Sequence, residues 1–135
     1  MKRKIIIAGG SGFLGKALAA HFSELGHEIT VFGRGSVLPN DFPEVNFVNW
    51  NGETLGNWTN ELDGAQVLIN LCGRSVDCRY NEENRTQILE SRTSATRILG
   101  EAVSATKNPP ATWLNASTAT IYDDRRTDLP PHDES

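Results

Sequence analysis

The chain has 135 residues, 38% of them apolar, so its length allows one domain with a hydrophobic core and is too short for two. Its 13 Lys and Arg residues against 17 Asp and Glu residues give a formal net charge of -4 without a basic stripe, which argues against a nucleic-acid partner. No apolar run approaches the roughly 20 residues of a membrane span, and the N-terminus lacks the apolar centre of a signal peptide. We therefore expect a cytoplasmic protein without a membrane partner.

Short apolar segments alternate with segments of helical spacing along the chain. In chain order, the sequence predicts a strand at 4–8, a helix at 13–25, strands at 27–34 and 45–50, a short helix at 58–62, a strand at 65–72, a long helix at 81–107 and a strand at 111–117. Continuous β-branched runs are typical of strands buried on both faces. The alternation predicts an α/β protein with a Rossmann-type, doubly wound parallel sheet that is truncated after its fifth strand.

A glycine-rich segment, AGGSGFLGKAL, joins the end of the first predicted strand to the start of the first predicted helix. Gly9 and Gly10 allow a tight turn, Gly12 lets the backbone approach a phosphate, and Gly15 lets the helix pack closely. The positive end of the helix favours an anion, and the Ser11 hydroxyl could add a donor. The loop is therefore interpreted as a seat for the pyrophosphate of a dinucleotide. The alternative is a purely structural turn.

The end of the second predicted strand bears on the choice of cofactor. NAD sites of this fold usually place an acidic residue there for the ribose hydroxyls, whereas a 2′-phosphate needs a positive charge. This chain has Arg34 in VFGRG and no acid. Because an arginine binds a phosphate through paired, charge-assisted hydrogen bonds, we predict NADP, with NAD as the alternative. Arg34 could also be an ordinary surface residue.

Arg92 lies in the middle of an apolar arc of the long helix. The arc consists of Ile88, Ala95, Leu99, Ala102 and Val103. One interpretation is a structural arginine whose stem packs while its head reaches water or a carboxylate, and the other is a functional role. The two cysteines, Cys72 and Cys78, have neither a CxxC spacing nor a histidine cluster, so we expect no disulfide and no metal site.

Three segments resemble the extended short-chain dehydrogenase/reductase superfamily, the nucleoside-diphosphate-sugar epimerases and dehydratases: GGSGFLG, NLCG and NASTATIY. An uncharacterised bacterial epimerase-like subgroup is similar also in Arg34, NLCGRSVDCRY and SRTSATRIL. The resemblance implies pyrophosphate binding by Gly9, Ser11, Gly12, Phe13, Leu14 and Gly15. It places Leu71, Cys72 and Gly73 under the adenosine and its ribose. It also implies that Thr118, with Ser117 as the alternative, orients the substrate oxygen, and that Arg92 contacts the substrate or a cofactor phosphate.

The resemblance further implies a catalytic tyrosine followed by a lysine four residues later. Neither Tyr80 nor Tyr122 has such a lysine. We therefore expect residues 1–122 to form a dinucleotide-binding domain, and 123–135 a loop leading to a C-terminal region that this chain lacks. The predicted function is the NADP-binding part of an epimerase/dehydratase or reductase that transfers hydride to a sugar-nucleotide-like or carbonyl substrate, inactive by itself. The alternatives are a non-catalytic NADP-sensing module and an interaction domain without a nucleotide.

Overall fold

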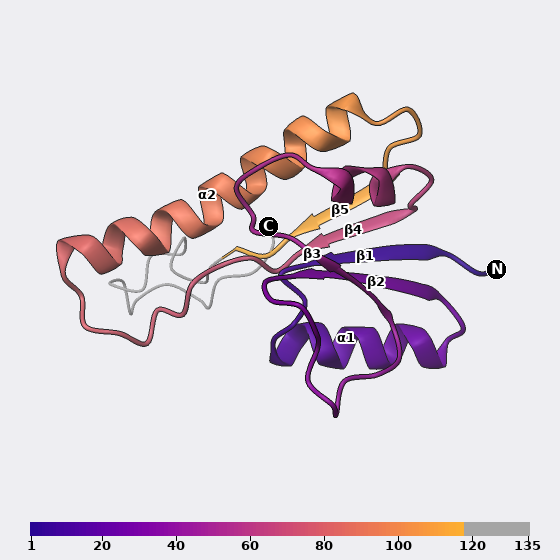
Figure 1. Cartoon of the computed structure of the whole chain (residues 1–135), viewed down its shortest axis with the longest axis horizontal. Coiled ribbons are helices and arrows are strands. Elements are labelled where there is room, and N and C mark those ends of the chain that lie inside the picture. Colours follow the sequence, from indigo (N-terminus) through magenta and orange to yellow (C-terminus); the bar gives the residue numbers. More distant parts are fainter. Residues whose placement is uncertain (118–135) are drawn as a thin grey trace, which may run out of the picture.

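Five parallel strands form the centre of the computed structural model, which describes residues 1–117 (Figure 1). They are β1 (Lys4–Ala8), β2 (Glu28–Gly33), β3 (Asn46–Asn49), β4 (Val67–Asn70) and β5 (Thr112–Asn115). The helices are α1 (Phe13–Glu24), the 3₁₀-helix η1 (Asn57–Leu62) and α2 (Glu82–Ala105). The sheet order is β3-β2-β1-β4-β5, which confirms the predicted doubly wound, Rossmann-type α/β fold.

Several strands are shorter than the apolar runs that predicted them, because the hydrogen-bonded neighbour limits each strand. The pairing of β1 with β4 runs from Ile5 opposite Val67 to Ala8 opposite Asn70. After Ala8 the chain turns at Gly9, whose φ is +70°, so the pairing of β4 with β1 ends there. The apolar run continues to Cys72, beyond the paired strand.

The two faces of the sheet are covered by different helices, and Figure 1 shows α1 on one side and α2 with η1 on the other. Alternate residues of β1 serve the two cores: Ile5 and Ile7 belong to the α1 side, Ile6 to the α2 side. On the α2 side, Phe32, Trp50 and Trp58 form an aromatic cluster with ring centroids 5.3–5.9 Å apart. Trp58 thereby anchors η1 to the sheet. Within residues 1–117, neither α-helix is apolar enough to cross a membrane.

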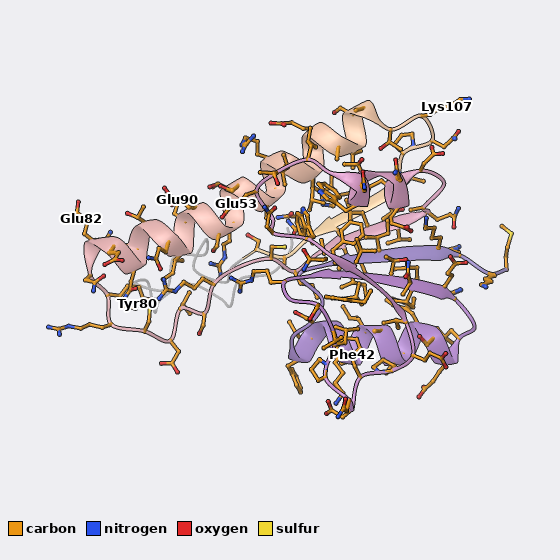
Figure 2. All side chains as sticks on the ribbon, in the orientation of Figure 1. Phe42, Glu53, Tyr80, Glu82, Glu90 and Lys107 are labelled. Atoms are coloured by element: carbon orange, nitrogen blue, oxygen red, sulfur yellow. The ribbon has the colours of Figure 1, made fainter. Side chains whose placement is uncertain are left out.

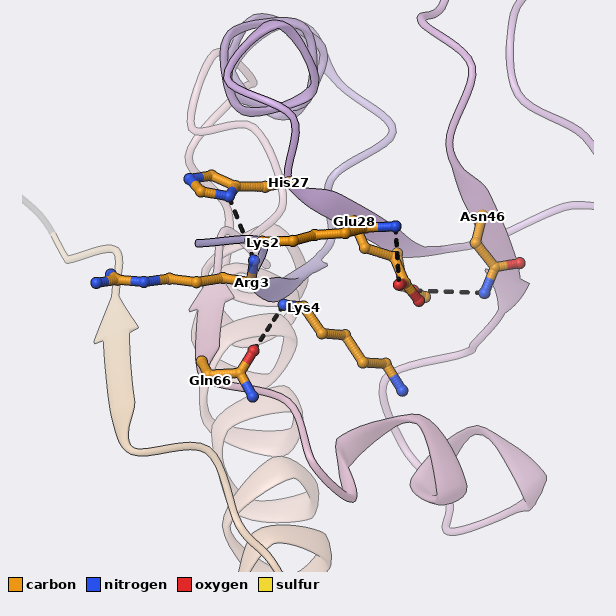
Figure 3. Close-up of polar contacts among 8 residues, drawn as sticks. Lys2, Arg3, Lys4, His27, Glu28, Asn46 and Gln66 are labelled. Carbon is orange, nitrogen blue, oxygen red and sulfur yellow. Dashed lines mark hydrogen bonds and ion pairs between the residues drawn. The ribbon is translucent and has the colours of Figure 1, made fainter.

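The amino ends of the strands are joined by polar contacts (Figure 3). The Lys4 amide donates to Gln66 Oε1 at 2.7 Å, and the Arg3 amide donates to His27 Nδ1 at 3.3 Å. Lys2 lies 3.6 Å from a carboxylate oxygen of Glu28. At the amino ends these polar groups are thus paired with one another. The carboxyl ends of the strands, by contrast, border a cavity.

The chain changes direction in the sheet between β1 and β4. From β1 it proceeds through β2 to β3, and it then returns to the other side of β1 to form β4. In open α/β sheets, ligands bind outside the carboxyl ends of the strands at this switch point. In this fold, the switch point lies at the loops after Ala8 and Asn70.

Candidate functional site

A cavity of about 610 Å³ lies at the switch point, a volume suited to a small-molecule ligand. It is lined by the glycine loop, the end of β2, the loop after β3, the segment after β4 and the first half of α2. Six of the predicted site residues line it: Gly9, Ser11, Arg34, Leu71, Cys72 and Gly73. Gly12, Phe13, Leu14 and Gly15 form the adjoining first turn of α1 and are not among its lining residues.

Close packing explains three glycines of the loop. A Cβ on Gly9 would lie 2.8 Å from Cys72 Sγ, and one on Gly10 would lie 2.7 Å from a methyl carbon of Ile7. A Cβ on Gly15 would overlap the Gly10 carbonyl, so the helix packs against the turn itself. These glycines are needed for the geometry of the loop, whatever it binds.

Gly12 differs from those three glycines, because no atom from elsewhere in the fold lies within 4 Å of its Cβ position. Its φ of -90° is also open to other residues. The absent side chain therefore leaves space at the start of α1, as the approach of a phosphate to the backbone would require.

The amino end of α1 has no side-chain cap, and its first turn contains no acidic residue. By contrast, Asn81 caps α2 by accepting a hydrogen bond from the Asn84 amide at 2.8 Å, and Glu82 and Glu83 lie in its first turn. Unpaired amides and the helix dipole favour an anion at such an end. The start of α1 thus fits the pyrophosphate of a dinucleotide, whereas that of α2 is already occupied.

Arg34 follows β2 and lines the cavity on the side opposite Cys72. No carboxylate among the described residues lies within 4 Å of its guanidinium. The loop after it is fastened at two points, by an Asn49 hydrogen bond to the Gly35 carbonyl and by an ion pair between Lys16 and Asp41. Lys16 also holds the pKa of the Asp41 carboxyl below its usual value. Within residues 1–117, Arg34 therefore offers a positive charge without a carboxylate partner, at the start of a loop that is held by these two contacts.

Cys72 forms part of the cavity wall below the glycine loop. Burial raises the pKa of its thiol from 9.0 to about 12, and the positive charge of Arg34 lowers it by a smaller amount. At neutral pH the thiol is therefore uncharged and contributes an almost apolar surface. It is poorly suited to act as a nucleophile.

The raised pKa of Cys72 predicts a pH dependence of stability. The unfolded chain loses the thiol proton near pH 9 and the folded chain near pH 12, so the free energy of unfolding should fall as pH rises between these values. We expect a loss of about 2 kcal/mol from pH 9 to pH 11. Urea unfolding across this range should show the loss in the native chain and not in Cys72→Ala. Equal pH slopes in the two proteins would contradict the prediction.

Two further predicted residues, Arg92 and Ser117, are described by the structure and are not among the lining residues of the cavity. Arg92 is half-buried on α2 and packs behind Gly73. Ser117 is exposed and follows β5. Thr118 lies outside the described residues, so its predicted role in orienting a substrate stays a prediction.

Two parts of the cavity wall were not predicted from the sequence. One is the loop after β3, from Trp50 to Glu53, and the other is the polar face of the first half of α2 that includes Glu90. Figure 2 labels Glu53 on the loop and Glu90 on the helix. None of the α2 residues before Ala95 is fully buried, which is a property of the packing and not a pattern of the sequence. No group of three or more His, Cys, Asp and Glu residues within 1–117 is placed to hold a metal ion.

The strand order, the glycine loop and the open helix start together define a Rossmann-type α/β protein. The sequence model of the NAD dependent epimerase/dehydratase family matches residues 5–135. The chain therefore belongs to that family, and the resemblance found in its sequence is confirmed.

Known relatives agree with this assignment. The epimerase family protein SSP1921 of Staphylococcus saprophyticus is 31% identical over 117 residues, which are 87% of this chain and 38% of that protein. The solved structure of human epimerase family protein SDR39U1 with NADPH has a TM-score of 0.69 at 24% identity, over 89% of this chain and 38% of that one. MoeE5 in complex with UDP-glucuronic acid and NAD has a TM-score of 0.71 at 19% identity, with coverages of 88% and 38%. The chain thus spans less than half the length of these proteins.

Proposed function

We propose that this chain is the NADP(H)-binding part of an epimerase/dehydratase or reductase, with the cofactor pyrophosphate held at the start of α1. One observation carries the proposal: an uncapped helix start, free of acidic residues, follows β1 at the switch point of the sheet. The open space at Gly12 supports it, because the phosphate needs that approach. Amides of Phe13, Leu14 and Gly15 and the Ser11 hydroxyl would donate to the pyrophosphate.

The preference for NADP over NAD rests on Arg34. Its guanidinium has no carboxylate partner among residues 1–117, and no acidic residue directly follows β2, where one would bind the ribose hydroxyls. A 2′-phosphate would supply the missing negative charge. The SDR39U1 structure contains NADPH and the MoeE5 structure contains NAD, so both cofactors occur among proteins of this fold.

The segment after β4 would form the floor under the adenosine and its ribose. Leu71, Cys72 and Gly73 line the cavity there, and the neutral Cys72 thiol suits contact with a sugar or a base. A bound nicotinamide dinucleotide supplies a carbon that accepts or donates hydride. We propose a sugar-nucleotide-like or carbonyl substrate for the complete protein, whose oxygen Thr118, or alternatively Ser117, would orient.

Calorimetric titration of the chain with NADPH and NADH tests the proposal directly. We expect saturable binding of both, with NADPH bound about 30-fold to 100-fold more tightly than NADH. Adenosine 2′,5′-bisphosphate, which lacks the nicotinamide half, should compete with NADPH. If neither dinucleotide binds at millimolar concentration, the cavity is not a dinucleotide site.

A further inference from the structure

Arg92 lies behind the cavity wall, on the side of α2 that faces the segment after β4. Its Nη1 donates to the carbonyl oxygens of Arg74 at 3.3 Å and Ile88 at 3.2 Å. No carboxylate of the described residues lies within 4 Å of its guanidinium. A half-buried charge that is satisfied by two backbone carbonyls ties the helix to the neighbouring segment.

The guanidinium also packs face-on against Gly73. Three of its atoms, Cζ, Nη2 and Nε, lie 2.9, 3.0 and 3.1 Å from the position that a Cβ on Gly73 would occupy. Nearly equal distances to three atoms of a planar group mean that this position lies over the plane. Any side chain on residue 73 would therefore displace the Arg92 head.

The contacted segment is part of the cavity, while Arg92 is not. Gly73 and Arg74 line the cavity, just beyond the end of β4 at Asn70. Because the sheet no longer holds the backbone there, α2 takes over: Ser91 Oγ accepts from the Arg74 amide at 2.9 Å, and Arg92 binds the Arg74 carbonyl. Side chains of α2 thus bind both the backbone amide and the backbone carbonyl of Arg74.

We propose that Arg92 is a positioning residue that fixes the backbone of Gly73 and Arg74 and thereby sets the affinity of the cavity for its dinucleotide. The inference rests on the proposed function, since it concerns the same cavity. A guanidinium suits this task because its flat face packs on a glycine while its edge donates to carbonyls. Arg92 acts through the wall and does not touch the cofactor.

A double-mutant cycle with NADPH titration tests the proposal. Arg92→Met and Gly73→Ala should each weaken NADPH binding about tenfold, and the double variant should also lose about tenfold, because both changes break one contact. Gly73→Ala should fold, since φ of Gly73 is not positive and the obstructing atoms belong to the end of a long side chain. Arg97→Met is the matched control: Arg97 is an exposed residue of α2 that pairs with Glu101, so NADPH binding should not change.

A second measurement separates positioning from general stability. Melting temperatures of the variants should stay within about 5 °C of the native chain while NADPH affinity falls. In the Gly73→Ala background, Arg92→Lys should recover most of the affinity, because a lysine can donate to the Arg74 carbonyl and has no planar head for the Cβ to displace. A hundredfold additive loss in the double variant, or native affinity in Arg92→Met, would overturn the proposal. Absence of NADPH and NADH binding by the native chain would instead overturn the proposed function.

Discussion

The Gly12→Val substitution is expected to abolish binding of both NADPH and NADH while the chain remains folded. No atom from elsewhere in the fold lies within 4 Å of the Gly12 Cβ position, and the φ of -90° is accessible to valine, so the protein itself can accept the side chain. The new methyl groups would fill the space through which a phosphate reaches the amides at the start of α1. Loss of these charge-assisted hydrogen bonds should weaken both dinucleotides at least about 100-fold.

A matched control for this result is Gly56→Val. Gly56 is the N-cap of η1, its backbone is extended, and its Cβ position makes only ordinary contact with Trp58 at 3.5 Å. The same side chain is thus added at another helix start, away from the glycine loop. Calorimetry should give native affinities for Gly56→Val, and circular dichroism should show both variants folded. A folded Gly12→Val protein that binds NADPH normally would show that the start of α1 is not the phosphate seat.

The fold could be predicted from the sequence because its determinants are local. Continuous runs such as residues 4–8 indicate buried parallel strands, and the glycine loop marks the change from strand to helix. Strand ends were less accurate because a partner sets them: β4 ends at Asn70, opposite Ala8, although its apolar run continues. Similarly, the sequence predicts close packing of the helix at Gly15, but the neighbour proves to be Gly10, a contact that depends on the shape of the turn.

The sequence predicted only those residues of the candidate site that lie at or just after the end of a predicted strand. Arg34 directly follows β2 and Cys72 lies two residues after β4, so the carboxyl edge of a parallel sheet brings them to the same cavity. The wall formed by Glu53 and Glu90 depends on how a loop and α2 approach each other across many intervening residues, which no local pattern encodes. The contact between Arg92 and Gly73 likewise depends on how α2 packs against the segment after β4. The sequence showed a charge within an apolar arc, but its partner could be found only from the packing.

The Arg34→Ala substitution is expected to remove the preference for NADPH. If the guanidinium binds the 2′-phosphate through paired hydrogen bonds, its loss should weaken NADPH binding by about 30-fold to 100-fold, since a hydrogen bond to a charged group contributes about 1.5–3 kcal/mol. NADH lacks that phosphate, so its affinity should change by less than about threefold. The two dissociation constants should therefore become nearly equal.

Charge alone must be separated from this specific contact, because removing any arginine makes the chain more negative and disfavours an anionic ligand. Arg3→Ala makes the same change of net charge at the amino ends of the strands, away from the cavity (Figure 3). At 0.15 M salt, where charges more than about 8 Å apart are largely screened, Arg3→Ala should leave both affinities nearly native. Arg34→Lys keeps the charge without the planar pair of donors and should lie between Arg34→Ala and the native chain. Equal weakening of NADPH and NADH in Arg34→Ala would mean that Arg34 interacts with the pyrophosphate shared by both, and the assignment of NADP would then lose its basis.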